Sequence, residues 1–525
     1  MSILQHQTTE QLRLELQATL DSAKSLSDRN KLGQFATPSA LASDMIRFAM
    51  SLLSKRMLVR FLDPAFGTGA FYSALLSALP QTRIAWAKGY EIDPHFGKPA
   101  KELWADTPLN LVLGDFTTAE PPRRDEDKAN LIICNPPYVR HHHLGPSSKQ
   151  RLRLTALRAS DVDLNGLSGL YCHFLAISHA WMAKNALAVW LVPSEFMDVN
   201  YGQPIKEYLG NRVTLLRIHR FDALDVQFSD ALVSSAVVCF RNAEPPSDHL
   251  VEFTYGGTLS RPKRTRTLEA RRLEPDAKWT HHALASKPRE CVERKVKLSD
   301  LLVIKRGIAT GANHFFVIPE AKARELGLPD RFLKPILPSP RFLKTDEIEA
   351  DTQGGPLIEP RLVLLDCKLP EEEVRRKHPS LWAYLESGRA QGIHDRYLSR
   401  HKQPWYAQEH REPAPLLCTY MGRNLRDRGA FRFILNHSRA IAANVYLMLY
   451  PKPPLTRCIQ HDPERLRTVW EALNLIPWET LIGVGRVYGG GLHKMEPKEL
   501  AQAPAYTLLE AMPEISVPIQ AQLNL

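Results

Sequence analysis

The sequence predicts an α/β fold, in which helices cover both faces of a mostly parallel sheet, and a separate α+β domain after it. First, apolar runs of strand length alternate with helical stretches over residues 31–241. Second, acidic or amide residues stand where several of these runs end, as at Asp63 and Asn135. Third, a chain of 525 residues is longer than one hydrophobic core supports, which predicts the further domain.

The expected elements follow one another in a regular order along the chain. TTEQLRLELQATLDSAKSLSDRN has apolar residues at helical spacing and no Gly or Pro, which predicts a helix. Further helices are expected in ALASDMIRFAMSLLSK, GAFYSALLSAL and LYCHFLAISHAWMAKN. The sheet is expected to contain VRFLDPAF, IAWAKGYEID, LNLVLGD, ANLIICNPP, LAVWLVPSE, VTLLRIHRF and SSAVVCFRN. Ligands of such sheets bind beyond the carboxyl ends of the strands.

Four segments are expected: an N-terminal helical segment (1–30), the α/β domain (31–245), a basic connector (246–295) and the α+β domain (296–525). The connector is expected because Pro, Gly and a dense run of Lys and Arg follow Arg241. Such a run is either a solvated linker or a surface that contacts phosphates, and the sequence leaves both readings open. The last domain has short β-like runs, such as RLVLLDC and VYLMLY, without clear βα alternation.

The composition is that of a globular protein, with 44% apolar and 24% charged residues. No apolar run is long enough to span a bilayer and MSILQHQTTE is no secretory leader, so we expect a cytoplasmic protein. Seven scattered cysteines without a CxxC pair indicate neither a disulfide framework nor a zinc site. Lys and Arg exceed Asp and Glu by 68 to 57, an excess that favours a polyanionic partner.

Three successive strands of the expected sheet end on acidic residues. VRFLDPAFGTGAF closes on Asp63 and turns through Gly67 and Gly69, where glycines let backbone N–H groups approach a ligand. GYEIDP places Glu91 at the end of the next strand, where a carboxylate can accept both ribose hydroxyls. LVLGDF places Asp115 at the end of the third. Each residue alone is explained as a cap or turn former, but together they predict a nucleoside pocket.

The fourth strand ends on Asn135-Pro136-Pro137-Tyr138, and this stretch predicts amine chemistry. The exocyclic amine of a base is a poor nucleophile because its lone pair is delocalised into the ring. The side-chain oxygen of Asn135 and the carbonyl of Pro136 can accept its two hydrogens, which localises the lone pair and stabilises the positive charge that develops. The prolines fix φ, and Tyr138 offers a flat face on which an extruded base can stack.

The ordered set GQFATP, DPAFGTGAF, GYEIDP, GDF and NPPY resembles the class I S-adenosylmethionine-dependent DNA adenine-N6 methyltransferases of the gamma motif order, found in type II restriction–modification systems. The resemblance covers residues 31–241 and implies a Rossmann-like methyltransferase sheet with S-adenosylmethionine as the cofactor. It assigns Glu91 to the ribose, and Asp115 with Phe116 to the adenine of the cofactor. The remaining contacts that it implies, mostly to the methionine part, are Thr37, Pro38, Asp63, Ala65, Gly67, Gly69 and Ile92.

The resemblance also implies a substrate, an adenine flipped out of duplex DNA. In that family a second aromatic residue sandwiches the flipped base, and Phe228 stands in the matching place. An ordinary core phenylalanine explains Phe228 equally well. His141-His142-His143 follow the NPPY stretch, but three adjacent side chains diverge and make a poor metal site, so no metal is expected there and loop residues that meet DNA phosphate are favoured.

Several stretches of the second half resemble the target-recognition domains of the same enzymes. They include KRGIATGANHFFVI, PWYAQEH and YGGGLHKMEPKEL. Such domains read base edges and hold phosphates with Arg, Lys, Asn and aromatic residues. The residues expected to bind DNA are Arg306, Thr310, Asn313, Trp405 and Tyr406.

Two other functions remain open from the sequence. NPPY presents the same acceptors to any planar amine, so RNA or a protein glutamine is an alternative substrate. A non-catalytic DNA-specificity subunit is the other alternative, although every expected acidic residue is present. The protein is expected to be bacterial and nucleoid-associated, and a monomer is expected because a reader of an asymmetric site needs no dimer symmetry. The resemblance implies a cognate restriction endonuclease as a functional partner.

Overall fold

The computed structural model describes residues 3–25, 28–29, 32–222, 227, 234–280, 282, 296–423, 429–460, 462, 464–488 and 491–515. The chain forms two compact units. The first comprises Met1–Arg289 with Tyr488–Gly490, and the second comprises Glu290–Val487 with Gly491–Leu525.

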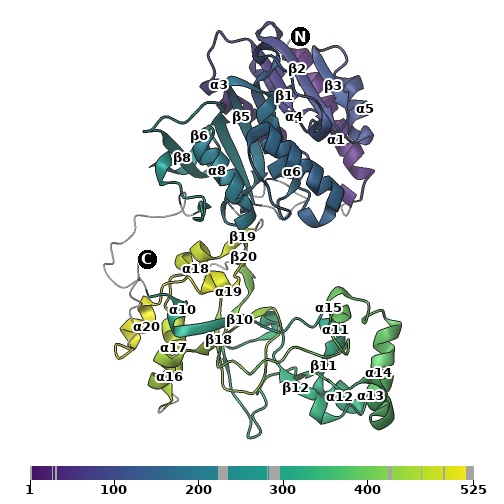
Figure 1. Ribbon diagram of the computed structural model, residues 1–525, viewed down its shortest axis with the longest axis vertical. Coiled ribbons are helices and arrows are strands. Elements are labelled where there is room, and N and C mark those ends of the chain that lie inside the picture. Colours follow the sequence, from purple (N-terminus) through teal and green to yellow (C-terminus); the bar gives the residue numbers. More distant parts are fainter. Residues whose placement is uncertain are drawn as a thin grey trace. The chain divides into compact units, whose positions relative to one another are not determined.

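A nine-stranded, mostly parallel sheet forms the centre of the first unit, in the order β3-β2-β1-β4-β5-β7-β6-β8-β9 (Figure 1). Strands β1 to β5 are mutually parallel, and β7 lies antiparallel between β5 and β6. The strands are β1 Val59–Asp63, β2 Ile84–Glu91, β3 Leu109–Leu113, β4 Ala129–Cys134, β5 Met182–Pro193, β6 Thr214–Arg220, β7 Ser235–Arg241, β8 Leu250–Gly257 and β9 Pro262–Glu269.

Helices cover both faces of this sheet and enclose two hydrophobic clusters (Figure 1). On one face the cluster includes apolar residues of α6, α7 and α8, and on the other those of α3, α4 and α5. Helix α1 packs against α4 and α5. The helices are α1 Ile3–Ser22, α3 Ser39–Leu52, α4 Ala70–Ala78, α5 Pro94–Leu103, α6 Pro146–Ser160, α7 Leu170–Ser178 and α8 Gln203–Asn211.

The predicted α/β fold is confirmed, and each of the seven expected strands is present. The central strand β4 is buried along its whole length because it lies between β1 and β5 under helices on both faces, which explains its apolar run from Leu131 to Cys134. Helices α5, α6 and α8 were not expected. Pro94 and Pro99 in α5, and the polar sequence of α6, obscure the apolar spacing that predicts a helix.

Residues 246–295 were expected to be a connector, whereas the structure places two strands of the sheet there. Strand β8 pairs with β6 in parallel and β9 pairs with β8 in an antiparallel hairpin. The many charges of β9 hid this strand because it is the edge of the sheet, where side chains stay in solvent. Residues 281 and 283–295 lie outside the described part of the chain.

The second unit contains three smaller sheets, with orders β10-β18-β15-β17-β13, β11-β14-β12 and β16-β20-β19. Most of their pairings are antiparallel, which matches the expected α+β class. The strands are β10 Leu302–Arg306, β11 Val317–Pro319, β12 Leu333–Ile336, β13 Glu347–Ile348, β14 Leu362–Leu365, β15 Leu416–Thr419, β16 Met421–Arg423, β17 Phe433–Asn436, β18 Tyr446–Pro451, β19 Arg486–Tyr488 and β20 Leu492–Lys494.

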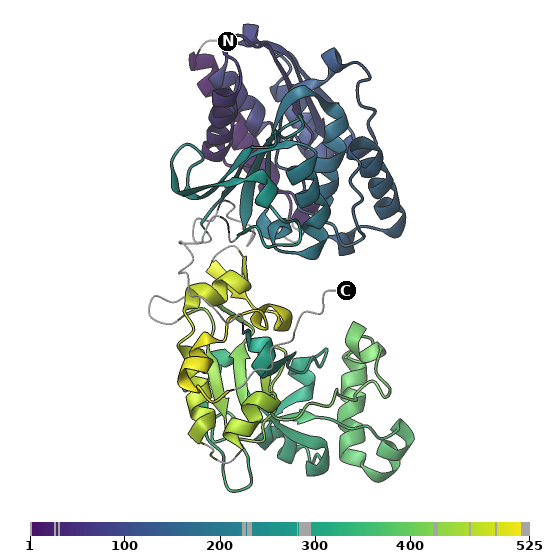
Figure 2. The same ribbon diagram turned by 60° about the vertical axis from the view of Figure 1, so that its left-hand side comes forward.

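Two groups of helices accompany these sheets. Figures 1 and 2 both show the green helices α13 and α14 to one side of the unit, away from the yellow helices of its C-terminal part. The helices are α10 Leu298–Leu301, α11 Asn313–Phe316, α12 Glu320–Glu325, α13 Glu371–Lys377, α14 Pro379–Ala390, α15 Tyr397–Arg400, α16 Pro453–Ile459, α17 Glu464–Asn474, α18 Trp478–Val484, α19 Pro497–Leu500 and α20 Tyr506–Ala511. Within the described residues, no helix is long and apolar enough to cross a membrane.

Candidate active site

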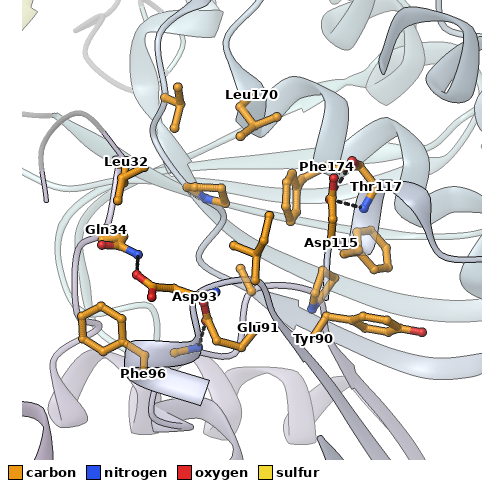
Figure 3. Close-up of a pocket in the computed structure, with 18 of the residues that line it drawn as sticks. Leu32, Gln34, Tyr90, Glu91, Asp93, Phe96, Asp115, Thr117, Leu170 and Phe174 are labelled. Carbon is orange, nitrogen blue, oxygen red and sulfur yellow. Dashed lines mark hydrogen bonds between the residues drawn. The ribbon is translucent and has the colours of Figure 1, made fainter. Parts of the chain in front are cut away.

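The carboxyl ends of β1, β2, β3 and β4 meet at one edge of the sheet, because these strands are adjacent and parallel. A cavity of about 650 Å³ opens there, and Figure 3 shows the side chains that line it. Of the residues expected to bind the cofactor, those that line it are Ala65, Gly67, Glu91, Ile92, Asp115 and Phe116. Asn135 and Pro137 of the NPPY stretch line it as well.

Glu91 lies at the end of β2, with its carboxylate held between two loops. Oε2 accepts the backbone N–H of Gly67 and Oε1 accepts that of Asp93, each at 2.8 Å. Gly67 has a φ of 56°, and a Cβ at that position would meet no heavy atom within 4 Å. Burial raises the pKa of Glu91 above its usual range, although the two N–H groups oppose that shift. The side chain is therefore a fixed acceptor in the wall of the cavity.

Asp115 and Phe116 follow β3 and form the opposite part of the wall. Asp115 Oδ1 accepts Thr117 N at 2.8 Å and Thr117 Oγ1 at 2.7 Å, as Figure 3 shows, and Arg151 of α6 lies 3.3 Å from Oδ2. The ring of Phe116 packs edge-on against Tyr90, at 5.4 Å between centroids. This end of the cavity thus combines an oriented carboxylate with aromatic surface, as recognition of a base requires.

Asp63, at the end of β1, is buried below the cavity. Oδ1 accepts Ala65 N at 3.2 Å. Among the described residues Oδ2 has no N–H or O–H partner, and its polar neighbour is the weakly donating thiol of Cys134. Burial raises the pKa of Asp63 to about 8, against the N–H of Ala65, and the nearby charge of Glu91 adds to the rise. An incoming cation would relieve this cost.

Asn135 lies directly after β4, and its side-chain amide forms hydrogen bonds through the nitrogen but, among the described residues, none through the oxygen. Nδ2 donates to Phe35 O at 3.0 Å and to Thr37 Oγ1 at 3.1 Å. These two bonds use both hydrogens of the amide nitrogen and fix its plane. The buried Oδ1 has no hydrogen-bond partner among the residues that the structure describes. A buried acceptor without a donor is costly, so this atom is suited to a donor on a ligand.

The GQFATP segment lies against the NPPY backbone, which explains why the two motifs occur together. Tyr138 N donates to Gly33 O at 3.1 Å. Gly33 has a φ of 64°, and a Cβ there would lie 2.4 Å from Tyr138 N, so any other residue would displace the NPPY backbone. Thr37 is not part of the cavity wall; its hydroxyl instead orients Asn135.

Tyr138 is buried, and it lies four residues after the end of β4. Its ring packs in the hydrophobic cluster that contains β1 and β4 residues and lies 5.7 Å from the ring of Phe35. Its hydroxyl donates to Leu191 O at 3.1 Å. Burial raises the pKa of Tyr138, so the hydroxyl stays protonated. Phe228, the second expected base-stacking residue, lies outside the described residues.

The sequence did not point to several residues of the cavity wall. Asp93 Oδ2 accepts Gln34 Nε2 at 2.8 Å (Figure 3). It is also paired with Lys24, which lies just after α1. Although burial opposes it, these bonds lower the pKa of Asp93, so its charge is retained. Lys24 and Asp93 are 69 residues apart, and no local spacing signals such a contact. Arg151 lies in α6, a helix that was not expected. Its contact with Asp115, 36 residues away, also has no local signal in the sequence.

The five residues of the second unit that were expected to bind DNA have different environments. Arg306 and Asn313 are exposed, and the Arg306 guanidinium lies 4.0 Å above the ring of Tyr420. Thr310 is buried and donates to Asn313 Oδ1 at 2.6 Å. Trp405 and Tyr406 pack in a hydrophobic cluster, where the Tyr406 hydroxyl donates to Leu369 O at 2.6 Å. The structure shows local hydrogen bonds for Thr310 and packing for Trp405 and Tyr406, and DNA contact stays a prediction for all five.

Two family models match the chain. The model described as the Eco57I restriction-modification methylase matches residues 90–227, and the one described as the C-terminal domain of type II methyltransferase M.Eco57I matches residues 276–522. Each matched range lies mostly in one of the two units. The chain resembles restriction–modification methyltransferases in both.

Named relatives agree with this resemblance, and one solved structure shares the fold. Type II methyltransferase M.AccI of Acinetobacter calcoaceticus is 26% identical over 490 residues, which are 91% of this chain and 85% of that protein. M.XamI of Xanthomonas campestris pv. amaranthicola is 26% identical over 482 residues, 90% and 84% of the two chains. The Type IIL restriction-modification enzyme MmeI, solved in complex with DNA, aligns with a TM-score of 0.57 at 11% identity, covering 95% of this chain and 77% of that one.

The fold is therefore a Rossmann-like class I methyltransferase sheet with an additional domain, and S-adenosylmethionine is the cofactor that this fold and these families imply. The residues present suit that cofactor. Asp63 Oδ2, which has no hydrogen-bond partner among the described residues, offers a place for an ammonium group. The Glu91 acceptor and the aromatic wall beside Asp115 offer places for a ribose and an adenine.

Proposed function

We propose that this chain is a site-specific DNA methyltransferase that methylates the exocyclic N6 amine of an adenine flipped out of duplex DNA. The observation that carries the proposal is the amide of Asn135. Its nitrogen is held by Phe35 O and Thr37 Oγ1, and no donor in the described part of the chain reaches its buried oxygen. An acceptor in that state fits the hydrogen of an amine that must be oriented and made nucleophilic.

The chemistry follows from the protein groups around that amine. Bound S-adenosylmethionine supplies a sulfonium methyl group, which is already activated for transfer. The Asn135 oxygen and the Pro136 carbonyl would accept the two amine hydrogens, so that the lone pair is no longer delocalised into the ring and the charge that develops on nitrogen is stabilised. The new N–C bond replaces the sulfonium C–S bond, and loss of one amine proton to water removes the charge. The two bonds to Nδ2 hold the amide in this orientation before substrate arrives, so little reorganisation is needed at the moment of reaction.

The target base needs a surface on which to stack once it leaves the duplex, because extrusion costs its stacking energy. Tyr138 supplies one ring, anchored by its hydroxyl on Leu191 O and by its packing against β-strand residues. Phe228 supplies the second. Glu91 binds the ribose of the cofactor, Asp115 and Phe116 bind its adenine, and Asp63 receives the ammonium group of its methionine part.

The affinity for S-adenosylmethionine is expected to rise as the pH increases from about 6 to about 7.5, by up to roughly tenfold per unit. The free Asp63 carboxyl has a pKa of about 8 and is mostly protonated over this range. A bound ammonium lowers that pKa, so binding releases a proton, and proton release is favoured as the pH rises. Calorimetry in buffers of different ionisation enthalpy measures the released proton directly. Asp63→Asn should bind weakly with a flat pH profile; an equally steep profile in this variant would remove Asp63 from the ammonium site.

Tyr138→Phe is expected to change the single-turnover methylation rate by less than about threefold, because the ring that stacks is kept. The loss of the bond to Leu191 O should lower the free energy of unfolding by about 1 kcal/mol. Thermal unfolding and rapid-quench methylation measure the two effects. Tyr138→Ala is the contrasting variant, since it removes the ring and should be severely impaired in both. A rate for Tyr138→Phe as low as that of Tyr138→Ala would assign the function to the hydroxyl instead.

DNA is the substrate class that the family resemblances support, and we propose that the two units divide the work. The first unit binds the cofactor and carries out methyl transfer, and the second selects the sequence through exposed residues such as Arg306 and Asn313. A monomer suits a reader of an asymmetric site, and a separate cognate restriction endonuclease is the functional partner. The amino-terminal piece ending near Arg289, if it folds, should bind cofactor without sequence-specific methylation.

The substrate class is tested by offering duplex DNA, RNA and protein side by side with S-adenosylmethionine labelled in the methyl group. Label is expected in duplex DNA, and at specific sites rather than evenly along it. Label in RNA or in protein glutamine alone would replace the proposal by one of these alternatives. Cofactor binding without any transfer would identify a specificity subunit that has lost catalysis.

A further inference from the structure

We propose that the hairpin at the edge of the large sheet binds the phosphates of the DNA duplex beside the target base. The basic hairpin comprises β8, β9 and the 3-10 turn Ala270–Arg272 that follows, residues 250–272. It lies outside the ranges of both matched family models. The inference rests on the proposed function and extends it, since it assigns part of the DNA contact to the unit that carries the chemistry.

The basic hairpin is a fixed surface. Strand β9 pairs with β8 along its length, from Leu250 opposite Glu269 to Gly257 opposite Pro262. Its tip is tied to α3, because Asp44 Oδ2 accepts Leu259 N at 2.7 Å and the Leu259 side chain is buried. Because backbone pairing and this anchor hold the hairpin in place, its cations are presented in a defined row.

The charge of the basic hairpin is strongly unbalanced. Glu252 is neutralised by Arg217 of β6, at 2.7 Å, and Glu269 is paired with the two arginines of the turn. Among the described residues, Arg261 and Arg264 have no ion-pair partner, and both are exposed. Six cations stand against two carboxylates in this segment: Arg261, Lys263, Arg264, Arg266, Arg271 and Arg272. Such a surplus on one edge complements a polyanion.

The topology of the sheet places the tip of the hairpin on the same side as Asn135, where the parallel strands end. Strand β8 is parallel to β6, and β6 and β5 are both antiparallel to β7, so β8 runs in the same direction as β5 and its parallel neighbour β4. The turn after Gly257 therefore lies on the side of the sheet where β4 ends at Cys134. Figure 1 shows β6 and β8 beyond β5 in this unit.

The spacing across the sheet suits a duplex. Five strand-to-strand steps separate β4 from β9, or about 24 Å at about 4.8 Å a step. This is the length of roughly seven base pairs at about 3.4 Å each. A duplex whose target nucleotide lies over Asn135 and which runs across the strand ends would bring flanking phosphates to Arg261 and Arg264. Contacts of this kind position DNA without reading its sequence.

A plainer role for these cations is to keep an exposed edge strand from pairing with other chains. That role needs charge anywhere along β9, whereas DNA binding needs it near the tip. The two cations chosen for the test, Arg261 and Arg264, lie at the tip and at the start of β9. Lys55 and Arg56 are the matched control. They are exposed and lie just before β1, on the side of the sheet where the parallel strands begin.

The test measures binding of full-length Arg261→Gln/Arg264→Gln to a fluorescent duplex of arbitrary sequence, at salt concentrations from about 50 to about 200 mM. Each phosphate contact contributes about 0.9 to the slope of log K against log salt, so the slope should become shallower by roughly 2. Affinity near 0.1 M salt should fall roughly tenfold to a hundredfold. Lys55→Gln/Arg56→Gln should keep the parent slope. Arg261→Lys/Arg264→Lys should also keep it, because both positive charges remain and counterion release depends on charge.

The proposal is overturned if Arg261→Gln/Arg264→Gln keeps the parent slope, or if the control variant loses as much. Association of the variant with itself in light scattering, with DNA binding intact, would assign the cations to protection of the edge strand. A parent protein that binds cofactor but neither binds nor methylates DNA would instead overturn the proposed function, so the two failures are distinguishable.

Discussion

Asn135→Ala is expected to lower the single-turnover rate of methyl transfer by on the order of a hundredfold or more, as loss of one preorganised polar group does in other enzymes. The amide oxygen is the acceptor that orients the amine, and alanine has nothing to replace it. Cofactor affinity should stay near that of the parent, because Glu91, Asp63 and Asp115 are untouched. Rapid-quench methylation with saturating DNA and cofactor, together with calorimetry of cofactor binding, separates the two effects.

Thr37→Val is the matched control for this prediction. It keeps the shape of the side chain and removes one of the two acceptors that hold Asn135 Nδ2, at 3.1 Å, while the bond to Phe35 O remains. The amide oxygen is still present but less well fixed, so a reduction of roughly threefold to tenfold is expected. Methylation by Asn135→Ala at the parent rate would show that the amine is activated elsewhere.

Glu91→Gln is expected to weaken S-adenosylmethionine binding by on the order of a hundredfold. Each carboxylate oxygen of Glu91 accepts a backbone N–H, from Gly67 and from Asp93. Glutamine has only one side-chain oxygen, so its NH₂ group would face one of these two N–H donors. The repulsion would displace that backbone segment, such as the loop that carries Gly67. The variant also loses the charge that binds the two ribose hydroxyls. Titration calorimetry with the cofactor gives the change in affinity directly.

Glu102→Gln provides the comparison, because Glu102 is exposed near the end of α5 and a loss of charge there reaches no ligand. It should bind the cofactor as the parent does. An unchanged affinity in Glu91→Gln would exclude Glu91 as the ribose anchor, whatever the methylation rate. Thermal unfolding of the variant without cofactor shows whether the lost N–H bonds also loosen the fold.

The parts of this molecule that the sequence predicted are those with local signals. The strands of the first unit are short apolar runs, and each ends on a residue that changes the pattern, such as Asp63 or Asn135. Because parallel strands end at one edge, finding their ends was sufficient to group Glu91, Asp115 and Asn135 around one cavity.

The parts that it did not predict depend on contacts between distant segments. Lys24 reaches Asp93 across 69 residues, and Arg151 reaches Asp115 across 36. The sequence does not predict the edge strand β9, because its exposed side chains lack the apolar residues that mark a strand. In the second unit, the packing of Trp405 and Tyr406 in a hydrophobic cluster had no local signal, because an aromatic ring suits a core and a DNA contact equally well. Their contact with DNA stays a prediction.

The identity of the methylated base tests the central claim most directly. Unmodified duplex DNA treated with the protein and S-adenosylmethionine is digested to nucleosides and analysed by mass spectrometry, with Asn135→Ala as the blank. We expect N6-methyladenine as the single new nucleoside, and sequencing of the treated DNA should place it at one position of a short recurring site. Methylcytosine in its place, or no modified nucleoside from a protein that binds the cofactor, would contradict the proposed function.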